Sequence, residues 1–225
     1  MSPDVLASLN ALAAVLFLLI TFSMITSPQV QSVLHGYIVQ SLLLTASTVL
    51  LAASERSPQL IVVAAITLIA KPILIPLLLW RMLGTSLRTK RELRLAVNTP
   101  TSLLLALALS IAAYFFTRPL LAGANDFERI NLPIGFDVVL LGVYTLAVRR
   151  EALPQLLGLM AIDNGAFFTG IAITHSSALV EFAAALEGVI VAMIVALLTR
   201  TIAQMVGTTE VAALDTLRER GGPGP

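Results

Sequence analysis

The sequence predicts an all-α integral membrane protein with seven transmembrane helices. Hydrophobic residues make up 57% of the 225 residues and charged residues only 12%, with a mean hydropathy of +0.93. Soluble domains carry about 25% charged residues, so this composition is typical of a membrane protein. A bilayer core about 30 Å thick needs about 20 apolar residues per helix. Seven stretches of the chain approach that length.

The first apolar stretch follows residues 1–4 with no basic region before it and is longer than a signal-peptide core, so we expect a retained helix. Breakers such as Ser27-Pro28, Ser57-Pro58 and Arg149-Arg150 separate later stretches and predict antiparallel neighbours. The fifth stretch is the shortest, and residues 131–133 are able to extend it outward. The predicted spans cover residues 4–26, 30–53, 59–83, 101–121, 133–148, 153–174 and 178–203.

Basic residues orient the predicted bundle, because lysine and arginine accumulate in cytoplasmic loops. With the N-terminus outside, the inner side collects 10 basic residues and the outer side 3, and Lys71 lies within the membrane. The predicted topology is therefore N-out and C-in. The inner residues are Arg81, Arg88, Lys90, Arg91, Arg94, Arg149, Arg150, Arg200, Arg218 and Arg220, and the outer residues are Arg56, Arg118 and Arg129.

Two three-helix units joined by a single helix are expected. Residues 1–83 and 133–206 each begin outside and end inside, and an offset of 122 positions places Ser41 onto Asp163. Transporter-like proteins use such internal repeats, and the layout here is 3+1+3 with parallel repeats. Residues 84–132 form the basic cytoplasmic loop, the fourth helix and an outer loop, and residues 207–225 form a cytoplasmic tail.

The absence of cysteine excludes disulfides, thiolate metal sites and cysteine-ligated iron–sulfur clusters in this chain. We therefore expect no cofactor, and any redox centre must lie on another chain. The formal net charge of +1 argues against nucleic acid as a partner. No nucleophile motif, phosphate loop or metal-ligand cluster predicts an active site in this sequence.

Ionisable residues within apolar stretches are the strongest functional signal, because a carboxylate at the bilayer centre costs about 2.5 to 3.5 kcal/mol. The helical rise places Lys71, Asp163 and Glu187 about 12 to 18 Å from the outer ends of their spans. Groups at one depth on different helices form a lateral polar path, so we expect these three to handle protons or ions. Alternatively, each belongs to a structural ion pair or an interhelical hydrogen bond. Glu181, near the outer end of the last span, is a candidate exit group.

The neighbours of these residues suggest how they act. Pro72 and Pro76 follow Lys71 and predict a kinked helix beside a buried lysine. Burial and a nearby carboxylate act in opposite directions on such a lysine, so it either switches its charge state or serves as a fixed counter-ion. Beside Asp163, Asn164 is expected to donate to the carboxylate, and Gly165 to let a neighbouring backbone or a file of water approach.

Polar residues in the second span add further candidates. His35, Gln40 and Ser41 lie in its inner half. Histidine titrates near neutrality, so His35 is either a proton-loading residue or an interhelical donor. Asp137 and Arg118 are expected near the outer ends of their spans, where water or head groups reach them.

Two stretches, RREALPQLLGLMAIDNGAFFTG (149–170) and VEFAAALEGVIVAMIVALLTR (180–200), resemble the second and third helices of subunit K of respiratory complex I and of its C-type relative in Mrp antiporters. The seven-span layout more closely resembles hydrogenase-4 component E of group 4 hydrogenase and formate hydrogenlyase-like complexes. Glu187 matches the glutamate of the last helix, and Met160 occupies the position of the other subunit-K glutamate. Asp163-Asn164-Gly165 resembles the acid-Asn-Gly pattern of the hydrogenase-type subunits, so Asp163 is expected to supply that carboxylate.

The resemblance implies a non-catalytic, multi-pass subunit in the cell membrane of a bacterium or archaeon, relaying protons in an energy-converting respiratory complex. The implied partners are antiporter-like and subunit-H-like membrane subunits, lipid, and peripheral iron–sulfur, hydrogenase-like or quinone-oxidoreductase-like subunits on the cytoplasmic side. Two alternatives stay open. One is a subunit of an Mrp-like cation/proton antiporter without a redox partner, and the other is a purely structural scaffold.

Overall fold

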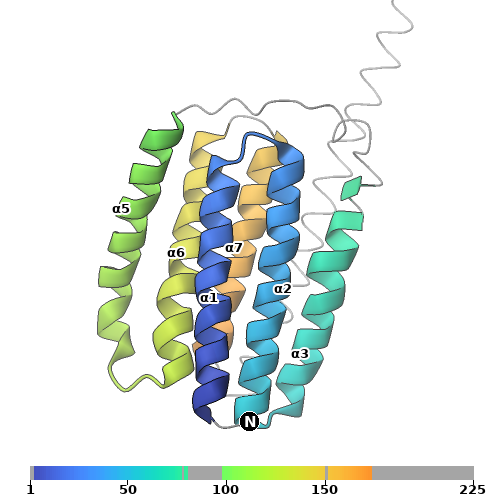
Figure 1. Cartoon of the computed structure of the whole chain (residues 1–225), viewed down its shortest axis with the longest axis vertical. Helices are drawn as coiled ribbons and strands as arrows, with labels where there is room; N and C mark the ends of the chain where they lie inside the picture. Colours follow the sequence, from blue (N-terminus) through green and yellow to red (C-terminus); the bar gives the residue numbers. More distant parts are fainter. Residues whose placement is uncertain (1–2, 78, 81–97, 150–151, 174–225) are drawn as a thin grey trace, which may run out of the picture. The chain divides into compact units, whose positions relative to one another are not determined.

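The computed structural model describes residues 3–77, 79–80, 98–149 and 152–173, which all belong to one compact unit within residues 1–187. Helices make up nearly all of the described chain (Figure 1). Five of them are long and apolar enough to cross a membrane, which is consistent with a multi-pass membrane protein. These five are Pro3–Thr26, Val30–Glu55, Pro58–Leu77, Thr99–Leu121 and Asp126–Val148.

The helices follow the predicted apolar stretches in order. The sixth stretch also forms a helix, of 22 residues, and the seventh stretch, at residues 178–203, lies outside the described residues. The elements are α1 (Pro3–Thr26), α2 (Val30–Glu55), α3 (Pro58–Ile69), the π-helical turn η1 (Ala70–Leu74), α5 (Thr99–Thr117), the 3₁₀ turn η2 (Arg118–Leu121), α6 (Asp126–Val148) and α7 (Ala152–Ile173).

Helix α6 begins at Asp126, well before the predicted start at residue 133. A capping box starts the helix early. Asn125 Oδ1 accepts the Glu128 backbone N–H at 2.9 Å, and a Glu128 carboxylate oxygen accepts the Asn125 N–H at 2.9 Å. Pro133 therefore lies inside the helix. The early charges and the proline suggested a loop, but the reciprocal cap satisfies the first backbone donors and extends the helix outward.

Glycines bring α6 and α7 close together. A methyl group on Gly165 would lie 2.7 Å from the Gly135 carbonyl oxygen and 2.8 Å from the Val139 nitrogen, so only glycine fits between these two backbones. Gly158 and Gly142 face each other in the same way farther along the two helices. The expected close backbone approach at Gly165 is thus present, and it packs α7 tightly against α6.

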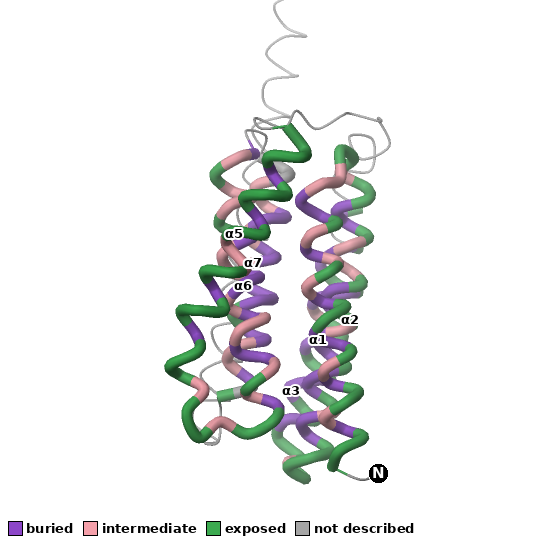
Figure 2. Tube along the Cα trace, turned by 60° about the vertical axis from the view of Figure 1, so that its left-hand side comes forward, coloured by how far each residue is buried: buried purple, intermediate pink, exposed green. Residues whose placement is uncertain are grey.

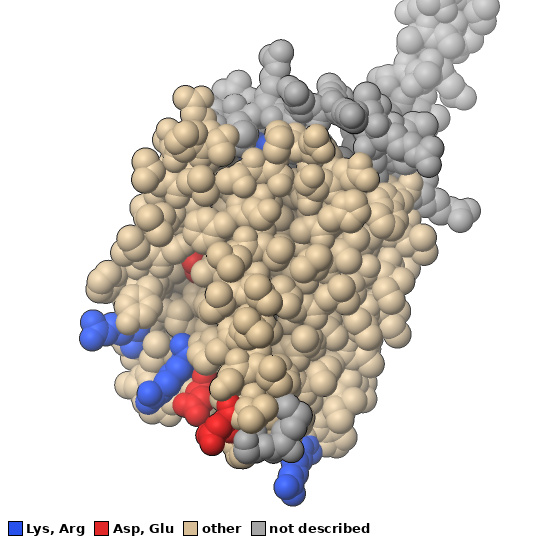
Figure 3. Space-filling model, in the orientation of Figure 1, with Lys and Arg blue, Asp and Glu red and all other residues tan. Residues whose placement is uncertain are grey.

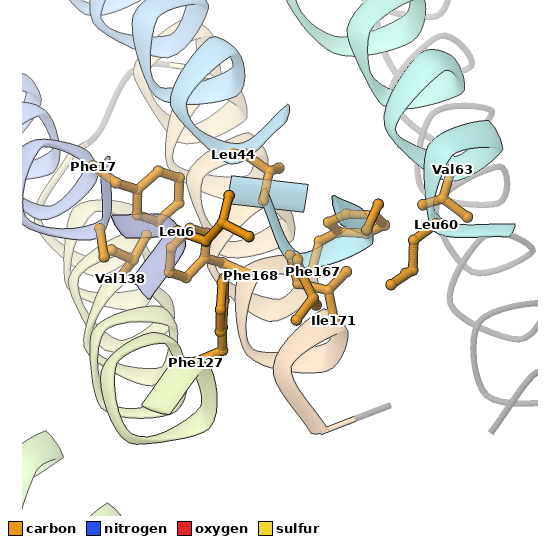
Figure 4. Packing of buried hydrophobic residues seen from close by; sticks show 13 residues of the cluster. Leu6, Phe17, Leu44, Leu60, Val63, Phe127, Val138, Phe167, Phe168 and Ile171 are labelled. Atoms are coloured by element: carbon orange, nitrogen blue, oxygen red, sulfur yellow. The ribbon is translucent and has the colours of Figure 1, made fainter. Parts of the chain in front are cut away.

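Aromatic and aliphatic side chains fill the centre of the bundle (Figure 4). The rings of Phe17 and Phe168 stack with their centroids 4.5 Å apart, which joins α1 to α7. Helix α5 packs on α6 at the edge and is largely exposed (Figures 1 and 2). Its outward residues include Leu104, Phe115 and Phe116, which suit a lipid environment.

Charged side chains on the face shown in Figure 3 gather mainly at one end of the bundle, and the band between the two ends is almost free of them. An apolar band flanked by charge is the surface that a bilayer requires. The few ionisable side chains buried within the described helices are therefore exceptions to the pattern.

Candidate functional site

Lys71 and Asp163 form a buried ion pair. The Lys71 Nζ atom lies 2.7 Å from Asp163 Oδ2, and the two side chains are 0% and 6% exposed. They come from η1 and α7, which are far apart in the sequence. The Lys71 ammonium also lies 4.9 Å from the centroid of the Phe167 ring, one turn from Asp163. The expected shared layer of the two residues is therefore a direct contact.

The backbone of η1 is widened where Lys71 lies. Pro72 has no amide hydrogen, so it cannot make the ordinary helical bond to the fourth residue before it. Farther along, the Ile75 N–H bonds to the Ala70 carbonyl, five residues back rather than the usual four, which gives a π-helical turn over Ala70–Leu74. The predicted proline distortion is thus present as a π-helical turn, a feature often found at functional positions.

Asn164 joins α7 to α2 rather than to the neighbouring carboxylate. Its amide Nδ2 donates to Gln40 Oε1 at 3.0 Å and to Ser41 Oγ at 3.1 Å. The expectation that Asn164 donates to Asp163 was wrong. Consecutive residues of a helix do not face each other, so Asp163 turns to η1 while Asn164 turns to α2.

A chain of hydrogen bonds continues from Asn164 to α1. Gln40 Nε2 donates to Thr21 Oγ1 at 2.7 Å, and Thr21 Oγ1 donates to the Phe17 carbonyl at 2.9 Å. Gln40, Ser41, Thr21 and Asn164 are all buried. The supporting polar residues chosen from the sequence therefore form one network, and Thr21 is the member that sequence reasoning missed. A threonine in an apolar helix carries little signal because it can bond to its own helix, as Thr21 also does.

Two buried polar atoms beside the ion pair have no hydrogen-bond partner among the described residues. They are Thr67 Oγ1, one turn before Lys71, and Asn164 Oδ1, next to Asp163. Buried polar groups are normally paired with protein or with ordered water. These two atoms are therefore natural binding points for water next to the charged pair.

His35, another predicted site residue, is not brought to the pair. His35 is exposed on α2, and its ring lies edge-on to Trp80 with centroids 6.4 Å apart. Glu181 and Glu187 lie outside the described residues. No group of three or more potential metal-ligating side chains occurs in the part of the chain that the structure describes.

A second buried polar cluster was absent from the sequence predictions. Asn10, Ser47 and Asn131 form a closed ring of three hydrogen bonds of 2.5 to 3.1 Å between α1, α2 and α6. All three side chains are 0% exposed. Each residue uses the others to satisfy its polar atoms, so the ring is a staple between helices. The unusual density of amides in apolar stretches was the available signal.

Asp137 also lies elsewhere than expected. It is the twelfth of the 23 residues of α6 and only 4% exposed, so it lies at the middle of the helix rather than near an outer end. The early start of α6 explains the error, since the added turns move Asp137 inward. Arg118, by contrast, is exposed at the start of η2, as expected.

The ion pair has simple proton chemistry. One proton can lie on the lysine nitrogen or on the carboxylate oxygen 2.7 Å away, giving either an ion pair or a neutral pair with the same net charge. A further proton added to the pair changes its net charge by one. Such a change in a low-dielectric interior alters the electrostatic energy of every nearby charge, which is the property needed for coupled proton transfer.

Comparison with known proteins yields one informative similarity. The chain is 28% identical over 166 residues to the uncharacterized protein Rv0085 of Mycobacterium tuberculosis (strain ATCC 25618 / H37Rv), which covers 73% of this chain and 76% of the relative. No family model and no solved structure matches the chain. The name of the relative assigns no activity, so the buried groups carry the functional argument.

Proposed function

We propose that this chain is a membrane-arm subunit of a multi-subunit energy-converting respiratory complex, related to hydrogenase-4 and complex I, and that it relays protons along a buried polar axis. The proposal includes seven spans, an N-out and C-in topology and the 3+1+3 arrangement of parallel repeats. The buried Lys71–Asp163 pair, within otherwise apolar helices, is the observation that carries it.

The energetic cost of the pair favours a functional reason for its presence. Taking two charges out of water costs several kcal/mol per ion, and well-packed hydrophobic residues often replace a buried pair with no loss of stability. Helix α7, which carries Asp163, is already held in the bundle by its glycine contacts with α6 and by the stacked rings of Phe17 and Phe168. A charged pair adds little to such a core, so we assign it to proton handling.

The surroundings of the pair support transfer rather than a sealed contact. Thr67 Oγ1, one turn before Lys71, and Asn164 Oδ1, on the residue after Asp163, are buried and have no partners among the described residues. Water bound at these atoms would extend the pair into a hydrogen-bonded path. In this proposal Asp163 loads and unloads the proton, Lys71 sets its energy by charge, and Glu187 and Glu181 continue the path.

Redox chemistry would take place on partner chains, because this sequence holds no cysteine for a cluster. A rearrangement in the redox module would change the hydration or the protonation of the buried groups. The partners in the proposal are antiporter-like and subunit-H-like membrane subunits, with iron–sulfur or quinone-oxidoreductase-like subunits on the cytoplasmic side.

The decisive test purifies the complex from native membranes in mild detergent and measures electron-driven proton uptake after reconstitution in vesicles. Copurifying iron–sulfur subunits are expected, and Asp163→Asn should abolish proton uptake while the complex still assembles. Glu55→Gln is the matched control, because Glu55 is an exposed carboxylate at the end of α2. If antiporter-like subunits copurify without iron–sulfur proteins, the chain is instead a subunit of an Mrp-like antiporter and this proposal is wrong.

A structural scaffold is the second candidate, and the network around Asn164 favours it. The hydrogen bonds of Asn164, Gln40 and Thr21 cross-link three helices, and the ion pair adds a fourth element. Lys71→Met combined with Asp163→Leu distinguishes the two candidates. If the complex assembles with this double variant and keeps full proton uptake, the chain is a structural scaffold and the proposed proton relay through the pair is wrong.

A further inference from the structure

Asp137 is a second buried carboxyl group in the middle of the helices, separate from the Lys71–Asp163 pair. It is 4% exposed, and its Oδ1 atom has no hydrogen-bond partner within the described part of the chain. Ser110 on α5 lies within hydrogen-bonding reach of its carboxyl group. Asp137 thus lies on the α5 side of α6, whereas Asp163 contacts η1.

No positive charge faces Asp137 from the described elements packed around it. Helix α5 contains no charged residue, η2 has only the exposed Arg118, and Asp4 is the only charged residue in α1. Within α6 the other charged residues lie in the first turns, and on α7 Asp163 is paired with Lys71. A buried carboxylate without a counter-charge is costly, so the neutral carboxylic acid is the favoured form.

The Ser110 hydroxyl lies within reach of two acceptors, the Ala106 carbonyl and the Asp137 carboxyl group. A serine hydroxyl has one hydrogen, and Ser110 Oγ donates it to the Ala106 carbonyl at 3.1 Å. The same hydroxyl donates to the Asp137 carboxylate only when it leaves Ala106, so Ser110 serves one of the two acceptors at a time. Loss of the proton from Asp137 requires Ser110 to turn away from Ala106.

Two further buried hydroxyl groups lie along the same interface. Tyr144 OH and Ser102 Oγ are buried and have no partner among the described residues. Helices α5 and α6 are antiparallel, with Ser110 bonded to Asp137 and Ala106 in one apolar cluster with Leu141, so Ser102 lies near the level of Tyr144. Both residues are close to the end of the bundle where α6 finishes, at Val148.

The direction of the tyrosine side chain favours a connection. Tyr144 lies two turns after Asp137, about 10 Å along the helix. Long side chains of a helix lean toward its N-terminus, so the ring of Tyr144 reaches back toward Asp137. Water molecules bound at the hydroxyl groups would connect Asp137 to Tyr144, since each buried water bonds to several polar atoms.

We propose that Asp137 is a second proton-binding site within the membrane, which exchanges its proton with the Val148 end of the bundle through water held by Tyr144 and Ser102. In the exchange, Asp137 releases a proton to a bound water, and a proton moves along the hydroxyl groups toward that end. The site is independent of the proposed relay at Asp163, because it lies between α5 and α6 and uses other residues, whereas the Lys71–Asp163 pair joins η1 to α7.

Modification by dicyclohexylcarbodiimide tests the site in the full chain in native membranes. A protonated carboxyl adds to this reagent, with its oxygen bonding to the central carbon and its proton passing to nitrogen, and the adduct rearranges to a stable acylurea. Mass spectrometry should find the adduct on Asp137, with labelling that falls about tenfold per pH unit above the midpoint, as for any single protonation equilibrium. Asp163→Asn should leave this labelling unchanged.

Infrared spectroscopy provides a second readout and tests the route. The infrared band of a protonated carboxyl group should disappear in Asp137→Asn. After transfer to deuterium oxide this band shifts as the proton is replaced by deuterium, and the shift should be slower in Tyr144→Phe than in the wild type. Tyr114→Phe is the control, because Tyr114 is 54% exposed on α5, and it should exchange as the wild type does. Absence of both the adduct and the band overturns the site, and equal exchange in both tyrosine variants overturns the route.

Discussion

Lys71 Nζ lies 2.7 Å from Asp163 Oδ2 in the interior of a bundle whose other central side chains are mostly apolar. The two residues lie on η1 and α7, so the pair links the N-terminal helices to α7. Its geometry predicts strong energetic coupling, because neither charge has bulk water to replace its partner.

Removal of one partner of this pair should cost far more than removal of both. Asp163→Asn leaves the Lys71 charge buried, and the free energy of unfolding should fall by about 3 to 5 kcal/mol. Lys71→Met with Asp163→Leu should recover most of that loss. Denaturant titration of the purified chain in detergent micelles measures the coupling. The two residues are not coupled if the loss of stability in the double variant equals the sum of the losses in Lys71→Met and Asp163→Leu measured alone.

The ring of Asn10, Ser47 and Asn131 predicts a second stability effect. Asn131→Leu removes the partner of the Asn10 amide Nδ2 and of the Ser47 hydroxyl oxygen and leaves only the bond between Ser47 and Asn10, which should lower the free energy of unfolding by about 1 to 3 kcal/mol. The control is Ser8→Ala, which removes an exposed hydrogen bond to the Asp4 carbonyl. That variant should change stability by less than about 0.5 kcal/mol. Equal effects of the two changes would contradict the role of the ring as a staple.

Glycines of α7 should respond in opposite ways to alanine. Gly165→Ala places a methyl group 2.7 Å from the Gly135 carbonyl oxygen, and overpacking of this kind costs about 1 to 3 kcal/mol. No atom of the described residues lies within 4 Å of a methyl group added to Gly170, so Gly170→Ala should raise stability by up to about 1 kcal/mol through helix propensity. Thermal unfolding midpoints in detergent distinguish the two. A gain of similar size at both positions would mean that propensity, not packing, decides.

Arg149 should hold the end of α1 to the end of α6. It is 4% exposed, and its Nη2 atom donates to the Ile25 carbonyl at 2.9 Å and the Ser27 carbonyl at 3.0 Å. A lysine lacks the planar, pre-organised guanidinium that aims the two N–H groups of Nη2 at these carbonyls, so Arg149→Lys should lower the free energy of unfolding by about 1.5 to 3 kcal/mol. It should also speed amide hydrogen exchange around residues 25–29.

Arg129→Lys is the control for Arg149→Lys, because Arg129 donates to the Ala124 carbonyl from an exposed position. Its effect should stay below about 1 kcal/mol. Unchanged exchange around residues 25–29 in Arg149→Lys would show that the two carbonyl bonds do not order this turn.

The positions of the described helices were largely predictable. Apolar stretch length and the Ser-Pro breakers located α1, α2, α3, α5 and α7 to within a few residues, because bilayer thickness sets helix length directly. The start of α6 was not predictable, since the polar residues of a capping box followed by a proline resemble a loop in sequence. That error moved Asp137 from the expected edge of its span to the middle of the helix.

The sequence by itself determined which residues are costly to bury, since Lys71, Asp163, Asn164 and Gln40 stand out against apolar neighbours. It also determined the helical class, because composition and stretch length are properties of the chain. Only the tertiary structure decided which groups meet: Asp163 with Lys71, Asn164 with Gln40 and Ser41, and Asn10 with Asn131. The rotation of each helix about its axis sets these pairs, and that rotation depends on glycine contacts and ring packing between helices rather than on any one segment.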